Sequence, residues 1–547
     1  MPVYLYALVL ALGVWLTKKW FVSRQLAAAP YPPGPKPKPL IGNVFDFPTS
    51  DAHEGYLELG KQYSSGLVYG TALGTKVLVL NKLDDAIELL DRRARETSDR
   101  PNIPIVDLGV VLPSIFSLSF LTIFRLGWDR NIVLLPYGKI WRFHRKICQQ
   151  NFRAEAARDY HPLLLKKCGE MLLQLLVDPQ NFEQHNKMFS ISVALITMFG
   201  YEIKSLEDPC IVAAEESIRL AGPLLFPGGS WLNIVPALRY IPSWFPGAVT
   251  RKVAAKVREL TEEVWRIPFE DVKRRVAEGV AIPSFVSNFL KQKAEVGASG
   301  EQEKAVINIA FTVYSAASDT TISATGSFFY LMACNPEIQR KAQAEIDRII
   351  CPGRLPNFED RPSLPYIDAI YREVLRFKPP VPLGVAHSII EDDYYRGYYI
   401  PKGTMIFANI WAMTRDAQIY PEPLKFKPER FLDSNGNLNG DDRVLAYGFG
   451  RRACVGKYIA SDTLWITFAS VLACFNIDKC TDKFGNVIGF NDDYHELGLG
   501  QFKSDFLCSF VPRSATAKQL SMGSINTFAI FSVWLINLGI LHSSEKF

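Results

Sequence analysis

The sequence lacks several features that mark common classes of protein. Its nine cysteines include no Cys-x-x-Cys pair, which argues against a zinc site and against a dense disulfide framework. Basic side chains exceed acidic ones by only 61 − 56 = 5, with no dense basic run, so the composition does not indicate a nucleic-acid partner. No Gly-x-Gly-x-x-Gly follows a predicted strand, so the chain has no nicotinamide or flavin fingerprint of its own. The scattered cysteines favour a protein whose body lies in a reducing compartment.

The first residues form an apolar run. Residues 2–17 carry no charge, and Lys18, Lys19 and Arg24 follow. With its flanks the run approaches the roughly 20 residues that span a bilayer, and basic residues after it stay on the cytoplasmic side. We therefore predict a transmembrane helix over residues 1–23 that holds the body of the chain on the cytosolic face of the endoplasmic reticulum membrane. A cleaved signal peptide is the alternative, but its basic residues would precede the apolar run.

The rest of the chain divides by composition. Residues 24–40 are rich in proline, which predicts a stiff, extended linker. Helical periodicity dominates the remaining body, residues 41–514, so we predict a mainly α catalytic domain with small β-sheet regions. The clearest helical patterns cover residues 251–270, 302–332 and 336–349, and the strand-like pieces cover 67–80, 394–400 and 405–408.

One loop concentrates residues that suit a reactive thiol. Residues 446–457 read Ala-Tyr-Gly-Phe-Gly-Arg-Arg-Ala-Cys-Val-Gly-Lys, and a helical pattern follows from Tyr458. Glycines let the backbone wrap closely and direct N–H groups at a sulfur. Together with the N-terminus of the following helix, these donors favour the thiolate form of Cys454. A thiolate ligand on haem iron promotes cleavage of the O–O bond; a buried free cysteine is the alternative.

This loop resembles the haem-binding loop of the cytochrome P450 superfamily, Phe-x-x-Gly-x-Arg-x-Cys-x-Gly. Gly450, Arg452, Cys454 and Gly456 match that pattern, and Tyr447 stands where the family has phenylalanine. The resemblance implies the cytochrome P450 fold and a haem b whose iron takes Cys454 as its axial ligand. It also implies that Arg452 contacts the cofactor, and the tyrosine hydroxyl is a candidate to tune the potential of the iron.

A second match to the family is a set of charged residues. Glu373 and Arg376 stand at i and i+3 on one helix, and Arg430 follows in a Pro-Glu-Arg-Phe sequence. In the family these residues form a buried cluster under the haem loop. Their expected role is structural rather than catalytic.

A third match concerns the haem propionates. Trp141 and Arg145, at i and i+4, resemble the pair with which the family meets a propionate, a cation against a carboxylate. His387 matches a position that often contacts a propionate. An isolated histidine with a structural role is the alternative.

A fourth match lies in the long apolar run over residues 306–332. There, residues 316–321 read Ala-Ala-Ser-Asp-Thr-Thr, and an acid in such a run is costly unless it has a partner or a function. The family pattern is Ala-Gly-x-Asp/Glu-Thr-Thr, where the helix opens over the iron, and Ala317 replaces its glycine. The resemblance implies that Asp319 and Thr320 relay protons to dioxygen, so that one oxygen leaves as water. The alternative is that the threonines bond back to the carbonyls four residues earlier.

The four motifs occur in the family's order, and the resemblance extends from about residue 30 to residue 513. We therefore expect a haem-thiolate monooxygenase. Fungal members like O-methylsterigmatocystin oxidoreductase are most similar, which implies secondary metabolism. The family also implies that NADPH supplies electrons through NADPH–cytochrome P450 reductase, docked near four basic residues, Arg142, Arg145, Lys146 and Lys457.

Apolar and aromatic residues at the positions of the substrate pocket predict a lipophilic substrate, such as a terpenoid, a polyketide or an aromatic compound. Ordinary core packing is the alternative for each of these residues, which are Phe311, Tyr314, Ala316, Val381, Leu383, Val385 and Leu497. A haem-thiolate isomerase or dehydratase is an alternative activity, but it has little need for Asp319 and Thr320. An inactive haem-binding protein is the other alternative. The identity of the substrate is not predicted.

Three apolar segments depart from a globular pattern. Residues 109–126 have no counterpart in the family, and we interpret them as an unspliced intron translated in frame, or else as an insertion at the pocket. Residues 515–547 are an atypical tail with an apolar end, either a second anchor or the product of a faulty gene structure. Residues 224–249 contain large aromatic side chains and are predicted to dip into the bilayer.

Overall fold

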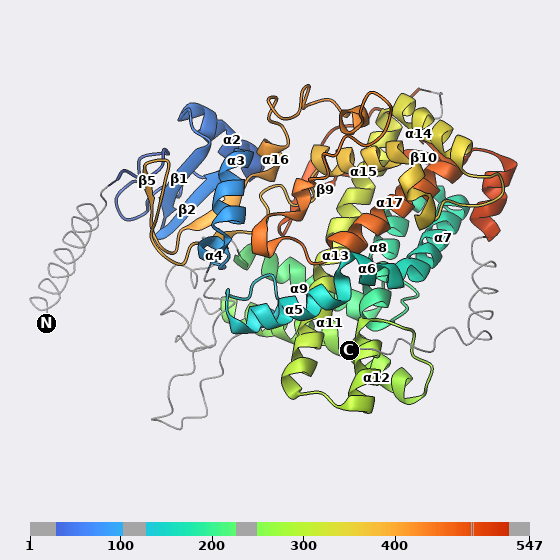
Figure 1. Cartoon of the computed structure of the whole chain (residues 1–547), viewed down its shortest axis with the longest axis horizontal. Coiled ribbons are helices and arrows are strands. Elements are labelled where there is room, and N and C mark those ends of the chain that lie inside the picture. The colour runs from blue at the N-terminus through green and yellow to red at the C-terminus, as the bar shows by residue number, and fades with distance from the viewer. Residues whose placement is uncertain (1–28, 102–126, 226–248, 483, 485, 524–547) are drawn as a thin grey trace, which may run out of the picture. The chain divides into compact units, whose positions relative to one another are not determined.

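The computed structural model describes residues 29–101, 127–225, 249–482, 484 and 486–523 (Figure 1). The chain divides into two compact units. Of the described residues, the first unit contains those up to Pro101 and Ala386–Asn409, and the second contains those from 127 to Val385 and from Ile410 onward. The described residues are mostly helical with small sheets, which confirms the predicted fold class.

The first unit is built on a four-stranded sheet with the order β1-β2-β6-β3. Strands β1 (Leu67–Ala72) and β2 (Thr75–Leu80) form an antiparallel hairpin, and β2 runs parallel to β6 (Met405–Ala408), which pairs with β3 (His387–Ser388). The predicted strand-like pieces 67–80 and 405–408 are therefore parts of one sheet, whereas the piece 394–400 forms a separate antiparallel pair. The other elements of this unit are α2 (Ala52–Gln62), α3 (Leu83–Ala86), the π-helical turn η1 (Ile87–Arg92), α4 (Ala94–Thr97), and the hairpin of β4 (Asp393–Tyr395) and β5 (Tyr398–Ile400).

The end of the predicted linker packs on this sheet. Tyr31 stacks on Tyr69 of β1 with ring centroids 5.2 Å apart, and the Tyr69 N–H donates to the Pro33 carbonyl at 2.8 Å. A side chain at Gly34 would collide with the Tyr69 carbonyl oxygen, so this close approach requires glycine. This part of the predicted linker, residues 24–40, therefore belongs to the first unit, because ring stacking and main-chain pairing hold it there.

The second unit is a bundle of helices. Its longer helices are α5 (Lys139–Phe152), α7 (His161–Val177), α8 (Phe182–Phe199), α9 (Pro209–Leu225), α11 (Val249–Ala277), α12 (Phe285–Val296), α13 (Gly300–Cys334), α14 (Pro336–Ile349), α15 (Pro365–Phe377) and α17 (Lys457–Cys474). Helix α13 packs against α8 and α17 (Figure 1). It begins with a capping box between Ser299 and Gln302, which satisfies two N–H groups of the first turn. Phe328 of α13 stacks on Phe468 of α17 with centroids 3.9 Å apart, in the core that fixes both helices.

Short elements complete the second unit. Two antiparallel pairs join β7 (Phe475–Lys479) with β10 (Cys508–Pro512), and β8 (Tyr494–Leu497) with β9 (Gly500–Lys503). The remaining turns are η2 (Trp128–Arg130), α6 (Ala154–Ala157), η3 (Arg158–Tyr160), η4 (Pro179–Asn181), η6 (Phe358–Ser363), α16 (Ile410–Met413), η7 (Pro428–Phe431), η8 (Leu445–Tyr447) and η9 (Gly450–Arg452).

Several predicted segments lie outside the described residues. These are the membrane anchor at residues 1–23, the segment 109–126, most of 224–249 and the tail beyond residue 523. The described beginning of the tail, residues 515–523, is helical, and its Ala517 and Ser521 are buried. Within the described ranges, no helix combines the length and the apolar character that a bilayer span requires.

Candidate active site

The cysteine loop links two 3₁₀ turns, η8 and η9, to the start of α17. Gly448 and Gly450 have φ angles of 72° and 54°, a region that L side chains disfavour. These turns allow the Cys454 N–H to donate to the Tyr447 carbonyl at 2.9 Å. The two glycines thus explain how so short a loop closes and presents the cysteine.

Cys454 combines accessibility with a desolvated setting. Five other cysteines are buried, whereas Cys454 is exposed. Burial nevertheless raises the pKa of its thiol, while the Gly456 N–H and the charges of Arg145 and Lys457 act in the opposite direction. Both observations hold if the sulfur lies in a recess that water enters and protein surrounds. A metal cation bound there would favour the thiolate.

Helix α5 places an aromatic ring and a cation beside the loop. The Arg145 guanidinium lies 5.6 Å from the centroid of the Trp141 ring and donates to the Ala453 carbonyl at 2.9 Å. The guanidinium of Arg452 lies over the same ring, 4.4 Å from its centroid. Burial lowers the pKa of Arg145, and no carboxylate among the described residues offsets that cost. These residues therefore fit a haem. The Cys454 thiol would bind the iron, and Arg145, which has no carboxylate partner among the described residues, would pair with a propionate.

His387 lies in the first unit, on β3. Its side chain is buried, and its Nδ1 donates to the Thr97 carbonyl at 3.0 Å. Because this contact is internal to the first unit, it supports a structural role there. The role of His387 at a propionate stays a prediction.

The three predicted cluster residues come together. Glu373 of α15 has a side chain that is 0% exposed, and Arg376 donates to its two carboxylate oxygens at 2.6 and 2.8 Å. Arg430, in η7, lies 3.1 Å from the same carboxylate. One buried negative charge is thus shared by two guanidinium groups, an arrangement that is stable only while every member is present.

The same guanidinium groups hold the chain between α16 and η7. Arg376 donates to the carbonyls of Thr414, Pro423 and Lys425, and Arg430 donates to those of Pro421, Glu422 and Lys425. Backbone in this irregular segment cannot pair within a helix or sheet, so the arginines supply its hydrogen bonds. The cluster therefore fixes the segment that leads towards the cysteine loop.

The predicted relay lies on a helix that does not open. Helix α13 is continuous from Gly300 to Cys334, so the break expected over residues 316–321 is absent. The Thr320 hydroxyl donates to the Ala316 carbonyl at 2.9 Å. This is the back-bonding that the alternative interpretation predicted, and a relay requires the hydroxyl to turn away from that carbonyl.

Asp319 has a neighbouring ion pair that sequence reasoning missed. Burial and the negative charge of Glu215 raise the pKa of Asp319 to about 6, and the positive charge of Lys187 opposes them. Lys187 of α8 and Glu215 of α9 form an ion pair at 2.7 Å. Neither residue belongs to a motif, and only the packing of helices brings them to Asp319, so the sequence carried no signal for them.

Two of the predicted substrate contacts face the core. Phe311 and Tyr314 are 4% and 2% exposed and belong to a cluster of buried apolar residues. They project about 140–160° around the helix from Ala316, which is exposed. Phe311 and Tyr314 thus pack among apolar side chains between helices, as large apolar residues usually do. Their contact with substrate stays a prediction.

The other predicted contacts lie on segments that meet α13. The Ser323 hydroxyl donates to the Gln501 carbonyl of β9, and the Gln501 N–H donates to the Pro380 carbonyl at 2.9 Å. These bonds join the β8–β9 hairpin and the segment after α15 to the same part of α13. The residues on these segments are the partly exposed Val381, Leu383 and Val385 and the exposed Leu497.

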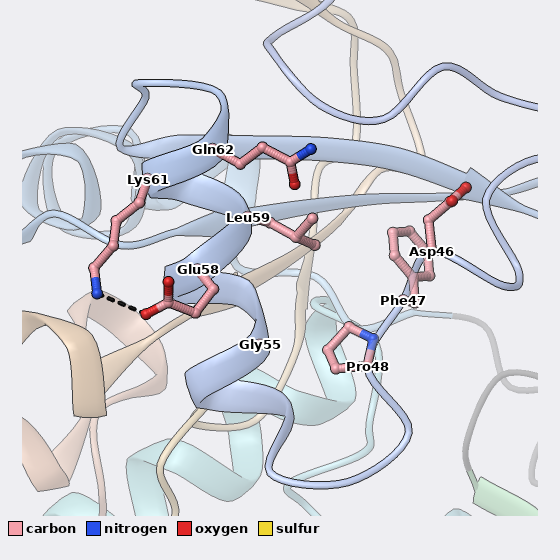
Figure 2. Close-up of a pocket in the computed structure, with 8 residues that line it drawn as sticks. All are labelled: Asp46, Phe47, Pro48, Gly55, Glu58, Leu59, Lys61 and Gln62. Atoms are coloured by element: carbon pink, nitrogen blue, oxygen red, sulfur yellow. Dashed lines mark hydrogen bonds and ion pairs between the residues drawn. The ribbon is translucent and has the colours of Figure 1, made fainter.

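A separate surface cleft lies in the first unit. Figure 2 shows it between the turn at residues 46–48 and α2, where Glu58 and Lys61 form an ion pair at 2.6 Å. None of the predicted site residues lines this cleft. It is therefore a feature of the surface of the first unit and not part of the candidate active site.

The helical bundle, the cysteine loop and its arginines define a haem-thiolate oxygenase. A sequence model of the cytochrome P450 family matches residues 32–486. The chain is 37% identical over 496 residues to cytochrome P450 monooxygenase COX2 of Coprinopsis cinerea, covering 90% of each protein. It is 33% identical over 520 residues to tryptamine 4-monooxygenase of Psilocybe cyanescens, covering 94% of this chain and 98% of the relative. The chain belongs to the cytochrome P450 family and is a monooxygenase.

Proposed function

We propose that this monooxygenase inserts one oxygen atom of O2 into a lipophilic small molecule, with Cys454 as the axial ligand of haem b. The observation that carries the proposal is the exposed Cys454 residue in a closed glycine loop, with its thiol beside the Gly456 N–H and the Arg145 charge. Haem bound there would supply the activation of dioxygen. NADPH would supply the electrons through a reductase, because no dinucleotide fingerprint occurs in the sequence.

We assign the residues near the loop two further roles, binding of a propionate and delivery of protons. Arg145, Arg452 and Trp141 would bind a propionate, since they place two cations on one ring beside the cysteine. Asp319 and Thr320 would deliver protons. A carboxyl with a pKa of about 6 exchanges its proton readily near neutral pH, which suits a general acid.

We propose that NADPH–cytochrome P450 reductase docks on exposed cations of α5 and α17. Arg142, Lys146 and Lys457 are exposed, and they carry the charge that an acidic partner would meet. Arg145 was expected in the same group, but it is partly buried and bonded to Ala453. Its role is therefore towards the cofactor and not towards the reductase.

We further propose that the enzyme is held at the endoplasmic reticulum membrane with its catalytic body in the cytosol. The support is the uncharged run at residues 2–17 followed by Lys18, Lys19 and Arg24. Such an anchor would keep the pocket near lipophilic substrates and near a membrane-bound reductase. Fractionation of cells that express the full chain and a variant without residues 1–23 tests the anchor: only the full chain should sediment with membranes.

The substrate class that we propose is a lipophilic secondary metabolite: a terpenoid, a polyketide or an aromatic compound. The support comes from apolar side chains that are solvent-accessible on segments joined to α13, namely Val381, Leu383, Val385 and Leu497. One relative is named for its action on tryptamine, which contains an aromatic indole ring. Aromatic compounds are therefore the first group of substrates to test.

The decisive experiment is turnover with isotopically heavy dioxygen. Purified full-length enzyme, reductase and NADPH are incubated with a panel of lipophilic metabolites, chosen by optical detection of binding at the haem. The proposal expects one heavy oxygen atom in the product and NADPH consumption that depends on the substrate. Product without heavy oxygen would instead indicate an isomerase or dehydratase, and binding without product from any compound would indicate an inactive haem protein.

A further inference from the structure

We propose that Lys187 and Glu215 are positioning residues for proton delivery, forming the solvent end of the path to Asp319 and setting its protonation in opposite directions. The inference rests on the proposed function, in which Asp319 passes protons towards dioxygen. It adds two residues on α8 and α9 to a path that the sequence motif confines to α13.

Helix α8 is registered against α13 at the level of Asp319. Asn186 is 3% exposed, and its side-chain amide donates to the Ile322 carbonyl at 2.9 Å. A buried amide bonded to the main chain of the neighbouring helix fixes the relative position of the two helices. Lys187, the next residue on α8, is thereby held near the turn of α13 that carries Asp319.

Helix α9 supplies the carboxylate of the pair. The Lys187 Nζ lies 2.7 Å from the Glu215 Oε1, and the two side chains are 37% and 50% exposed. Both groups thus remain in contact with bulk water, whereas Asp319 is only partly exposed. The more exposed pair would therefore exchange protons with solvent ahead of Asp319.

The charges near Asp319 are few. Glu215 and Lys187 are the charged groups of the described chain that act on its titration. Tyr314 also lies close to Asp319, and Cys210 is its neighbour, but burial raises the pKa of both, that of Cys210 to about 12, so they are neutral at the pH of turnover. The state of Asp319 near neutral pH therefore depends on one positive and one negative side chain.

This arrangement gives a signature that an ordinary surface ion pair does not have. An exposed pair adds little to stability, and losing either partner has the same consequence, loss of the pair. Electrostatic control of Asp319 predicts opposite consequences. Without Glu215 the carboxylate of Asp319 is more stable and its protonation midpoint falls, and without Lys187 the midpoint rises.

The test compares Glu215→Gln, Lys187→Gln and Lys187→Arg in the haem-loaded enzyme. Infrared titration follows the stretching band of the protonated carboxyl that Asp319→Asn removes. We expect the midpoint of the Asp319 titration to fall by roughly 0.5–1 pH unit in Glu215→Gln and to rise by a similar amount in Lys187→Gln. Lys187→Arg should keep the wild-type midpoint because it keeps the charge.

The second readout is the pH profile of product formed per NADPH consumed. The part of this profile that reflects the titration of Asp319 should shift with the infrared midpoint. It should move to lower pH in Glu215→Gln and to higher pH in Lys187→Gln. The matched controls are Glu216→Gln and Arg219→Gln, which break an exposed pair on the same helix with a separation of 2.6 Å and should leave both readouts unchanged.

Midpoints that stay at the wild-type value, or that move in the same direction in both variants, would overturn the inference. Midpoints that shift as expected while the pH profile stays fixed would also overturn it, because Asp319 would then not limit proton delivery. The proposed function fails separately: it fails if the wild-type enzyme forms no oxygenated product, whatever the variants show.

Discussion

The charged cluster on α15 and the acid–hydroxyl segment on α13 are both polar groups inside the second unit, but they are held very differently. Glu373 accepts two bonds from Arg376 and also meets Arg430, and the arginines are bonded to main-chain carbonyls. Within the described ranges, Thr320 in contrast bonds only to carbonyls of its own helix. Asp319 has no side-chain hydrogen bond to the part of the chain that is described.

The difference indicates that the cluster on α15 supports the cysteine loop, whereas the segment on α13 takes part in the reaction. A cluster with many shared bonds has one stable arrangement, so it suits a frame for the cysteine loop. Groups with few external bonds can exchange partners at low cost, so they suit proton transfer. Breaking the cluster should therefore cost stability, and breaking the α13 segment should cost chemistry.

The largest expected effect is that of Glu373→Ala. The variant leaves two guanidinium groups buried without their carboxylate, at a cost on the order of 3–5 kcal/mol in the free energy of unfolding. Urea unfolding and the yield of haem-loaded protein measure it. Glu216→Ala, at an exposed ion pair, is the control and should not change either quantity. An unfolding free energy equal to wild type in Glu373→Ala would remove the assigned role of the cluster.

Thr320→Ala should have the opposite profile. We expect product formation to slow on the order of 10²-fold while NADPH consumption continues, with the free energy of unfolding within about 0.5 kcal/mol of wild type. Ser315→Ala removes a similar back-bonded hydroxyl, whose bond to Phe311 is 2.9 Å, and serves as control with normal coupling. Normal coupling in Thr320→Ala would contradict the relay.

Asp319→Asn should stabilise the enzyme at neutral pH. The pKa of Asp319 is raised from 3.8 to about 6 in the folded protein, so the folded state binds the proton more tightly than the unfolded state. Wild-type stability therefore falls as pH rises from about 4 to about 6, and the variant avoids a loss of up to about 3 kcal/mol. Urea unfolding from pH 4 to pH 8 should show the two proteins diverging across that window. Curves that stay parallel would mean that the pKa is not raised.

The smallest effect concerns the reductase. Raising the ionic strength screens contacts between exposed charges, so turnover with reductase should fall a few-fold at high salt. Lys146→Ala should raise the KM for reductase about two- to threefold without changing kcat. Lys291→Ala, an exposed lysine on α12, should leave the KM unchanged. A Lys146→Ala variant with the wild-type KM would place the docking site elsewhere.

The sequence predicted features that depend on neighbours in the chain. The bounds of α14, Pro336–Ile349, agree with the predicted range because proline at the start of a helix is a local signal. The loop of Cys454 was equally readable, since its glycines and arginines lie within ten residues of the cysteine.

Features that depend on distant segments were not predictable in this way. The pairing of β2 with β6, and the approach of Lys187 and Glu215 to Asp319, arise from packing between segments far apart in the sequence. The burial of Phe311 and Tyr314 was not predictable either, because α13 is apolar around most of its circumference, so periodicity does not distinguish its pocket side from its core side.

The most direct measurement is the carbon monoxide spectrum of the reduced protein, taken for wild type, Cys454→Ser and Cys351→Ser. Cys351 is the other exposed cysteine and serves as the matched control. We predict the red-shifted band of thiolate-ligated haem in wild type and in Cys351→Ser, and its loss in Cys454→Ser. Retention of that band in Cys454→Ser would show that another residue holds the iron and would contradict the account.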